Sequence, residues 1–140
     1  MAYFGEFFYT LDASNRIILP SRFREPLGTD VILYKASEGC LFIYDMATFE
    51  QITAPLSALT KTDAGRQMVR RFYSDTSPVS VDRSGRLVVP AECIEHASLK
   101  DDVVVLGAGN RIEVWDKAAY EKNIGDKAAL GADEYPEIAF

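Results

Sequence analysis

A nine-residue segment of this chain recurs 70 residues later, and this internal repeat limits the possible folds more than any other feature of the sequence. Residues 12–20 (DASNRIILP) match residues 82–90 (DRSGRLVVP). The match continues downstream in the same order, since residues 31–34 and 41–45 align with 103–106 and 112–116. Ordered self-similarity is typical of duplicated structural units. We therefore expect two copies of one small unit that share a core.

The pattern of apolar residues and turn formers predicts the elements of each copy. A strand (residues 7–11) leads into a turn, and a β-branched strand (17–19) follows and ends at Pro20, because proline cannot donate a ladder hydrogen bond. A short helix with Phe23 and Leu27 on one face comes next, and a strand pair closes the copy. The strand pair is 31–35 with 40–44, and the second copy has strands at 79–81, 87–89, 103–106 and 111–115. These patterns predict a mostly β fold with short helices, of the α+β class.

Four segments are expected along the 140-residue chain. Residues 1–53 form the first copy, and residues 74–124 form the second. Residues 54–73 connect them, and the acidic residues 125–140 form a tail that we expect to be flexible.

The connecting segment contains one predicted helix. Residues 60–63 (TKTD) resemble a capping-box start, and Ala64, Met68 and Phe72 follow at four-residue spacing with Val69 beside them. Four basic residues lie off this apolar stripe: Lys61, Arg66, Arg70 and Arg71. They are either the solvated face of a packing helix or contacts to phosphate or to another subunit.

The charge of the chain is unevenly distributed. A net charge of −6 counts against nucleic-acid binding, which usually needs a basic surface. Residues 60–90, however, hold 6 Lys and Arg against 3 Asp and Glu, whereas residues 91–140 hold 5 against 11. Because binding depends on the local field, this asymmetry keeps DNA binding open.

In both copies the chain bends at the pattern D-x-x-(N/G)-R. Aspartate favours the first position of such a turn, because its carboxylate accepts hydrogen bonds from backbone amides ahead of it. The fourth position, Asn15 or Gly85, is expected to have a positive φ, which these two residue types tolerate. The next residue, Arg16 or Arg86, then begins the returning strand at a rigid tip.

An arginine at such a tip has two possible roles. It forms a structural ion pair with Asp12 or Asp82, or its planar guanidinium binds phosphate oxygens or the O6/N7 edge of guanine. A two-stranded ribbon is narrow enough to enter a major groove, which favours the second role. The candidate DNA-binding residues are Arg16, Arg86, Asp12, Asp82, Ser14, Asn15, Arg83, Ser84, Gly85, Arg22 and Arg24.

These motifs together resemble the MraZ family. The resemblance covers about residues 4–124 and rests on Phe4-Gly-Glu6, the paired D-x-x-x-R turns, Gly39-Cys-Leu41 and residues 107–115 (GAGNRIEVW). It implies two tandem swapped-hairpin units of the AbrB/SpoVT type that form a pseudo-two-fold β-barrel. It also implies a ring-like homo-oligomer that binds repeated promoter sites upstream of the division and cell-wall gene cluster, including its own operon.

The resemblance assigns DNA contact to the D-x-x-x-R loops, hence to Arg16 and Arg86, with Asp12 and Asp82 organising the loops. The first loop departs from the family pattern. It has Ser14 and Asn15 where a basic residue and glycine are common, which removes positive charge.

Other functions find little support in the sequence. His96 is the only histidine and has no evident catalytic partner, and no P-loop or H-E-x-x-H motif is present, so we expect no enzyme, cofactor, metal or small-molecule substrate. No apolar run is long enough to span a membrane, and we expect a cytoplasmic, nucleoid-associated protein with Cys40 and Cys93 reduced.

The alternative function is a protein-binding scaffold of the swapped-hairpin type, which the negative net charge favours.

Overall fold

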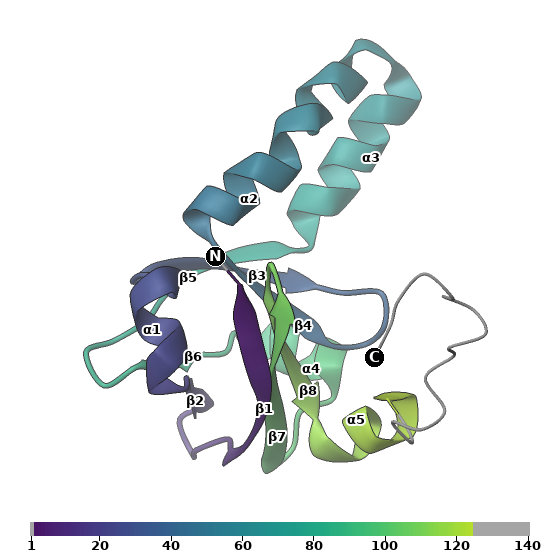
Figure 1. Ribbon diagram of the computed structural model, residues 1–140. Coiled ribbons are helices and arrows are strands. Elements are labelled where there is room, and N and C mark those ends of the chain that lie inside the picture. The colour runs from purple at the N-terminus through teal and green to yellow at the C-terminus, as the bar shows by residue number, and fades with distance from the viewer. Residues whose placement is uncertain (1, 125–140) are drawn as a thin grey trace, which may run out of the picture.

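The computed structural model describes residues 2–124 of the chain, so the acidic tail expected at 125–140 lies outside the described residues (Figure 1). Each copy contains two strands, a helix, two further strands and a second helix. In the first copy these are β1 (Tyr3–Thr10), β2 (Arg16–Ile18), α1 (Ser21–Leu27), β3 (Asp30–Lys35), β4 (Leu41–Asp45) and α2 (Met46–Thr53). In the second they are β5 (Thr76–Ser80), β6 (Arg86–Val88), α4 (Ala91–Ala97), β7 (Asp102–Gly109), β8 (Ile112–Asp116) and α5 (Lys117–Ile124). The predicted α+β class is confirmed.

The two copies exchange their first strands. β1 pairs with β7 of the second copy and β5 pairs with β3 of the first, both antiparallel, within a six-stranded sheet of order β1-β7-β8-β4-β3-β5. The predicted strand pairs β3–β4 and β7–β8 form, and β4–β8 joins them across the copies. The short strands β2 and β6 pair with each other as a separate ribbon, so neither copy completes its sheet or ribbon alone.

The strands do not close into a continuous barrel. Within residues 2–124, β1 and β5 form the two ends of the large sheet and do not pair with each other, and the β2–β6 ribbon is a sheet of its own. The ribbon is short because Pro20 and Pro90 follow its strands closely and are the N-cap residues of α1 (Ser21–Leu27) and α4 (Ala91–Ala97). Figure 1 shows the ribbon and α1 beside the large sheet.

Both copies contribute to one core between the sheet and the ribbon. The inward residues Ile17 and Leu87 of the ribbon are each 1% exposed, and Phe23 of α1 packs edge-on against Tyr3 at 5.5 Å between ring centroids. Cys93 and Cys40 are buried free thiols, as expected. Burial of this apolar surface against both copies is the main favourable term in holding them together.

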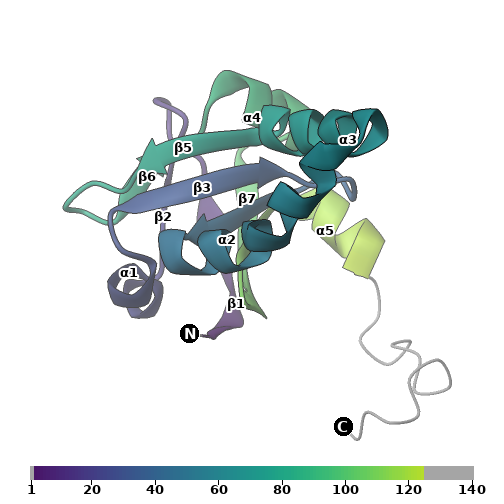
Figure 2. The ribbon, with the colours of Figure 1, turned by 90° about the horizontal axis from the view of Figure 1, so that it is seen from above.

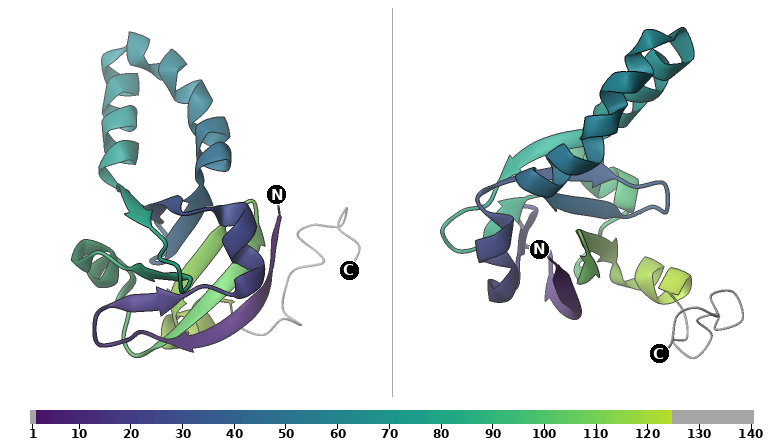
Figure 3. Two further views of the ribbon diagram at one scale, coloured as in Figure 1. Left: turned by 90° about the vertical axis from the view of Figure 1, so that its left-hand side faces the viewer. Right: turned by 45° about the horizontal axis from the view of Figure 1, so that its top comes forward.

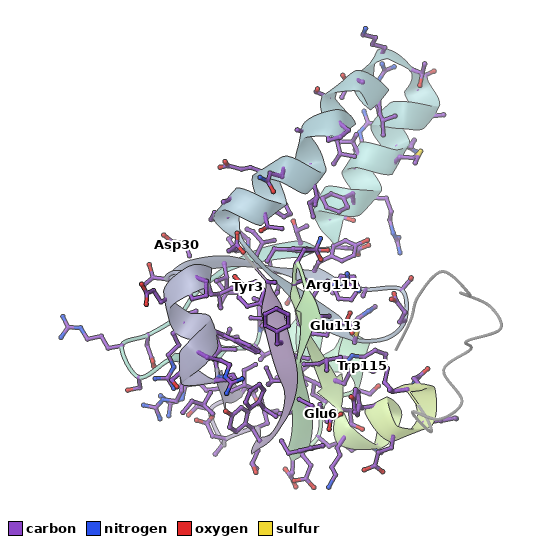
Figure 4. All side chains as sticks on the ribbon, viewed as in Figure 1. Tyr3, Glu6, Asp30, Arg111, Glu113 and Trp115 are labelled. Carbon is purple, nitrogen blue, oxygen red and sulfur yellow. The ribbon has the colours of Figure 1, made fainter. Side chains whose placement is uncertain are left out.

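Each copy also contains a buried carboxylate, Asp45 in the first and Glu113 in the second, whose side-chain partners lie in the same copy. Asp45 accepts a hydrogen bond from the Tyr3 hydroxyl at 2.8 Å and caps α2 through the Thr48 amide at 2.7 Å. Glu113, on β8, accepts bonds from Trp115 Nε1 and Arg111 Nε, each at 2.9 Å, and these three side chains are labelled in Figure 4.

The connecting segment forms, together with α2 of the first copy, a helical hairpin that projects from the sheet (Figures 1 and 3). It contributes a 3₁₀ helix (η1, Ala54–Lys61) and α3 (Asp63–Ser74). The predicted helix start is wrong by two residues. Thr62 caps α3 by accepting from the Gly65 amide at 3.0 Å, while residues 54–61 already form η1.

The predicted apolar stripe on α3 is only partly buried. Phe72 stacks on Tyr34 at 5.1 Å, but Met68 is 63% exposed. Gly65 is buried instead, since a Cβ atom there would lie 1.8 Å from the carbonyl oxygen of Leu59. The close approach of η1 at this glycine rotates α3 away from the face that the four-residue spacing predicts. None of the described helices combines the length and apolarity needed to cross a bilayer.

Candidate nucleic-acid interface

The two Asp-to-Arg turns flank the ribbon that both copies build. We call residues 12–16 the first loop and residues 82–86 the second loop. In the ribbon Arg16 is opposite Val88 and Arg86 is opposite Ile18. Two further bonds tie each loop to the other copy, from the Leu19 amide to the Gly85 carbonyl and from the Val89 amide to the Asn15 carbonyl, each at 2.8 Å. Figure 2 shows the turn between β5 and β6 extending from the body.

The first loop is organised by Asp12. One carboxylate oxygen accepts the backbone amides of Ser14 at 2.8 Å and Arg16 at 2.9 Å, and the Asn15 amide donates to the Asp12 carbonyl at 3.0 Å. Asn15 has a φ of 59°, which confirms the expected left-handed position. The other carboxylate oxygen accepts Arg16 Nε at 2.9 Å.

The second loop repeats the backbone geometry. Asp82 accepts the amides of Ser84 at 2.8 Å and Arg86 at 2.9 Å, and Gly85 has a φ of 77° as expected. Its ion pair is looser, because Arg86 Nε lies 3.8 Å from the Asp82 carboxylate. This nitrogen is buried and has no hydrogen-bond partner among residues 2–124.

Both interpretations of Arg16 and Arg86, the ion pair with aspartate and the binding of an external acceptor, are therefore compatible with the structure. The Nε atom of Arg16 donates a hydrogen bond to Asp12, as the ion-pair interpretation requires. Its side chain is still 34% exposed, and that of Arg86 is 38% exposed. The terminal nitrogens of neither arginine make a hydrogen bond to any residue in the described range 2–124, and a guanidinium has five N–H donors in all. Each arginine side chain can thus remain paired with its aspartate and bind an external acceptor through its terminal nitrogens.

The other candidate residues lie around the same ribbon. Ser14, Arg83 and Ser84 are exposed at the loop tips. Arg22 is exposed on α1, with its guanidinium carbon 5.5 Å from the Phe7 ring centroid. Arg24 is half-buried, and its Nε donates to the Leu19 carbonyl at 3.0 Å.

One contact at this site was missed by reasoning from the sequence. Arg24 of the first copy lies against Gly85 of the second loop, where a Cβ atom would be 2.0 Å from Arg24 Nε. The signal was present in the repeat. The first loop has Asn15 where the second has Gly85, and the second copy has Ile94 where the first has Arg24.

Both loop carboxyls are held in the ionised form. The backbone hydrogen bond from Arg16 is the largest cause that lowers the pKa of Asp12, and its hydrogen bonds to the Arg16 side chain and Ser14 amide add to it. For Asp82 the backbone hydrogen bond from Arg86 is the largest cause of the lowered pKa, and Ser84 adds to it. Hydrogen bonds to the charged form favour that form.

We expect the loops to survive acidification to about pH 4. Because folding lowers both pKa values, their stabilising effect is present above the unfolded value of 3.8 and is lost as the pH falls through the folded values. Carboxyl titration by NMR would show both groups titrating below 3.8, with faster amide exchange at Arg16 and Arg86 following the same titration. In an Asp12→Asn variant this pH-dependent rise in amide exchange should be lost at Arg16 and should remain at Arg86. Midpoints at or above 3.8 would contradict the geometry.

Exchanged strands, a shared core and two matching Asp–Arg loops define a class, that of tandem swapped-hairpin α+β proteins. The family model described as "MraZ protein, putative antitoxin-like" matches residues 2–72 and again 72–134. The chain belongs to the MraZ family, which confirms the resemblance inferred from the motifs.

Curated relatives agree over most of the chain. The "Transcriptional regulator MraZ" of Acetivibrio thermocellus is 40% identical over 126 residues, covering 89% of this chain and 88% of its own. That of Clostridium acetobutylicum is 40% identical and covers 82% of each chain, and that of Heliobacterium modesticaldum is 38% identical and covers 96% of this chain and 94% of its own. The relatives are named as regulators and not as enzymes, in line with the expectation for this chain.

Proposed function

We propose that this chain is a transcription regulator that binds double-stranded DNA through its first and second loops. The observation that carries the proposal is the pair of tip arginines, which are partly exposed and stand in aspartate-organised loops on a ribbon shared between the copies. A rigid ribbon with guanidinium groups at its turns suits entry into the major groove. The names of the relatives support a role in transcription.

Each candidate residue other than Arg24, which contacts the second loop, has a role in this proposal. Arg16 and Arg86 bind guanine edges or phosphate oxygens, while Asp12 and Asp82 fix the loops and stay ionised. The exposed Arg22 and Arg83 add phosphate contacts. The remaining loop residues set the backbone shape or line the tips: Ser14, Asn15, Ser84 and Gly85.

The proposal extends to tandem sites and a ring of subunits. Within the described residues one subunit offers few guanidinium groups on a surface whose overall charge is negative, so a single subunit should bind weakly. A homo-oligomeric ring that presents several loop pairs to repeated promoter sites raises the effective concentration of each later contact. We propose that these sites lie upstream of the division and cell-wall gene cluster and that the regulator acts at the nucleoid in the cytoplasm, as the resemblance to the family implies.

The experiment that tests the function is gel retardation of the DNA upstream of the chain's own gene, followed across a salt series. We expect retardation that weakens steeply between about 50 and 200 mM salt, because each neutralised phosphate contributes about −0.9 to the slope of log K against log salt. DNA of equal length and shuffled sequence is the control. Equal binding to both DNAs would contradict a sequence-specific regulator.

The second candidate function is a protein-binding scaffold without direct DNA contact. Two large apolar side chains favour it, since Phe4 and Phe8 on the outer face of β1 are 68% and 55% exposed. Exposed aromatic residues are enriched at protein interfaces. Failure to retard promoter DNA at low salt, together with an unchanged oligomeric mass, would favour this candidate.

A further inference from the structure

The second loop is in contact with a side chain from the other copy. The Nε, Cζ and Cδ atoms of Arg24 lie 2.0, 2.2 and 2.7 Å from the position that a Cβ atom at Gly85 would occupy. Gly85 is itself buried and has a φ of 77°. The space beside the loop backbone is therefore filled by a guanidinium group of α1, and glycine is needed there for room as well as for conformation.

Arg24 is also fixed at its other side. Its Nε donates to the Leu19 carbonyl at 3.0 Å, and the Leu19 amide donates to the Gly85 carbonyl at 2.8 Å. Leu19 thus joins the arginine and the loop through its own two backbone groups. A residue that is both packed on Gly85 and bonded to the strand that holds Gly85 restricts movement of the second loop.

Within residues 2–124 the first loop has no corresponding arginine from the other copy's helix. The repeat places Ile94 where Arg24 stands and Val89 where Leu19 stands. The backbone bond is kept, from the Val89 amide to the Asn15 carbonyl at 2.8 Å, but the Ile94 side chain has no donor and packs against the core. The first loop is held instead by its own ion pair of Arg16 and Asp12 at 2.9 Å.

The ion pair of the second loop is looser by comparison. Arg86 Nε is 3.8 Å from the Asp82 carboxylate and lacks a hydrogen-bond partner within the described part of the chain. The two loops are therefore held by different interactions. The first uses the arginine at its own tip, and the second uses an arginine from the other copy.

We propose that Arg24 is a positioning residue for the second loop, which it holds in place of the Asp82–Arg86 pair so that Arg86 is left to bind DNA. The inference rests on the proposed DNA-binding function, and it assigns Arg24 a role other than direct phosphate contact. It also makes the two loops of one subunit unequal, although their backbones are alike.

The test begins with the free protein, so that it does not depend on DNA binding. Amide hydrogen exchange by NMR compares the wild type with Arg24→Ala. We expect the amides of Leu19, Gly85 and Arg86 to exchange about tenfold faster in the variant, the size expected for loss of one hydrogen bond. The equivalent amides of the first loop and its strand, Asn15, Arg16 and Val89, should not change.

The matched control is Arg22→Ala. It removes the same charge from the same helix but touches neither loop, since Arg22 is exposed near the Phe7 ring. Exchange at both loops should stay at the wild-type rate. Arg24→Lys keeps the charge and the aliphatic stem but loses Nε and the planar fork, so it should behave like Arg24→Ala and serves as the readout if the alanine variant does not fold.

DNA binding then separates positioning from contact. We expect Arg24→Ala and Arg24→Lys to bind promoter DNA about tenfold more weakly with an unchanged salt slope. Wild-type exchange at the second loop in both variants would overturn the proposal. So would a slope reduced by about 0.9 in Arg24→Ala and restored in Arg24→Lys, because that result marks a direct phosphate contact. A protein that never binds DNA would refute the proposed function, while the exchange data would still decide whether Arg24 holds the loop.

Discussion

The Arg16→Ala/Arg86→Ala double variant is expected to lose sequence-specific DNA binding while keeping its fold and its oligomeric mass. Each bidentate arginine contact to a base is worth about 1–3 kcal/mol, so removing two should weaken binding by roughly 30-fold to 10⁴-fold. If both groups contact phosphate instead, the salt slope should also become shallower by about 2 per subunit.

The loops themselves should survive this substitution. The aspartates organise them through the backbone amides of residues 14, 16, 84 and 86, which alanine retains. Both arginine side chains are more than one-third exposed, so little core packing is lost. Circular dichroism and solution mass would verify the fold and the assembly.

A charge-matched control makes the result specific to the loops. Lys61→Ala/Arg70→Ala removes the same charge from exposed positions on the helical hairpin, away from the ribbon. We expect this variant to bind promoter DNA within about threefold of wild type at physiological salt, because charges beyond a Debye length of about 8 Å are largely screened. Wild-type affinity in the loop variant, or an equal loss in both variants, would reject the assignment of DNA contact to Arg16 and Arg86.

Promoter DNA with several repeats is expected to bind about 10²–10⁴ times more tightly than DNA with a single repeat. The physical reason is the effective concentration. Once one loop pair of an oligomer is bound, the next pair meets its own site without a new bimolecular encounter. Fluorescence anisotropy on DNAs with one, two and three repeats in fragments of equal length would measure the increase.

Helical phase supplies the control for this second prediction. Inserting about five base pairs between two repeats turns one site to the opposite side of the duplex without changing either sequence. The gain from the second repeat should then largely disappear, and an insertion of a full turn should restore much of it. Equal affinity for one repeat and for several would contradict the multivalent model.

The turns show how far local chemistry can be predicted. The hydrogen bonds that Asp12 accepts in the first loop join residues within 12–16, and those that Asp82 accepts in the second join residues within 82–86. The aspartate at position one and the residue with positive φ at position four therefore followed from residue types alone. The strand pairs β3–β4 and β7–β8 were predictable for the same reason, because short turns join their strands.

The helical hairpin shows where periodicity was an insufficient guide. Four-residue spacing placed Ala64, Met68 and Phe72 on one buried face, yet Met68 is exposed. The orientation of α3 is decided by the close approach of η1 at Gly65, and the sequence gives no sign that residues 54–61 are helical and lie there.

The sequence by itself determined that two copies of one unit are present, where each turns, and which arginine follows each turn. Only the tertiary structure decided which copy each strand joins and which side chain reaches Gly85. The two copies are so alike that a strand meets similar apolar partners in either one, so pattern cannot choose between pairing within a copy and pairing across copies. The path of the chain makes that choice, and with it Arg24 of the first copy comes to lie on the loop of the second.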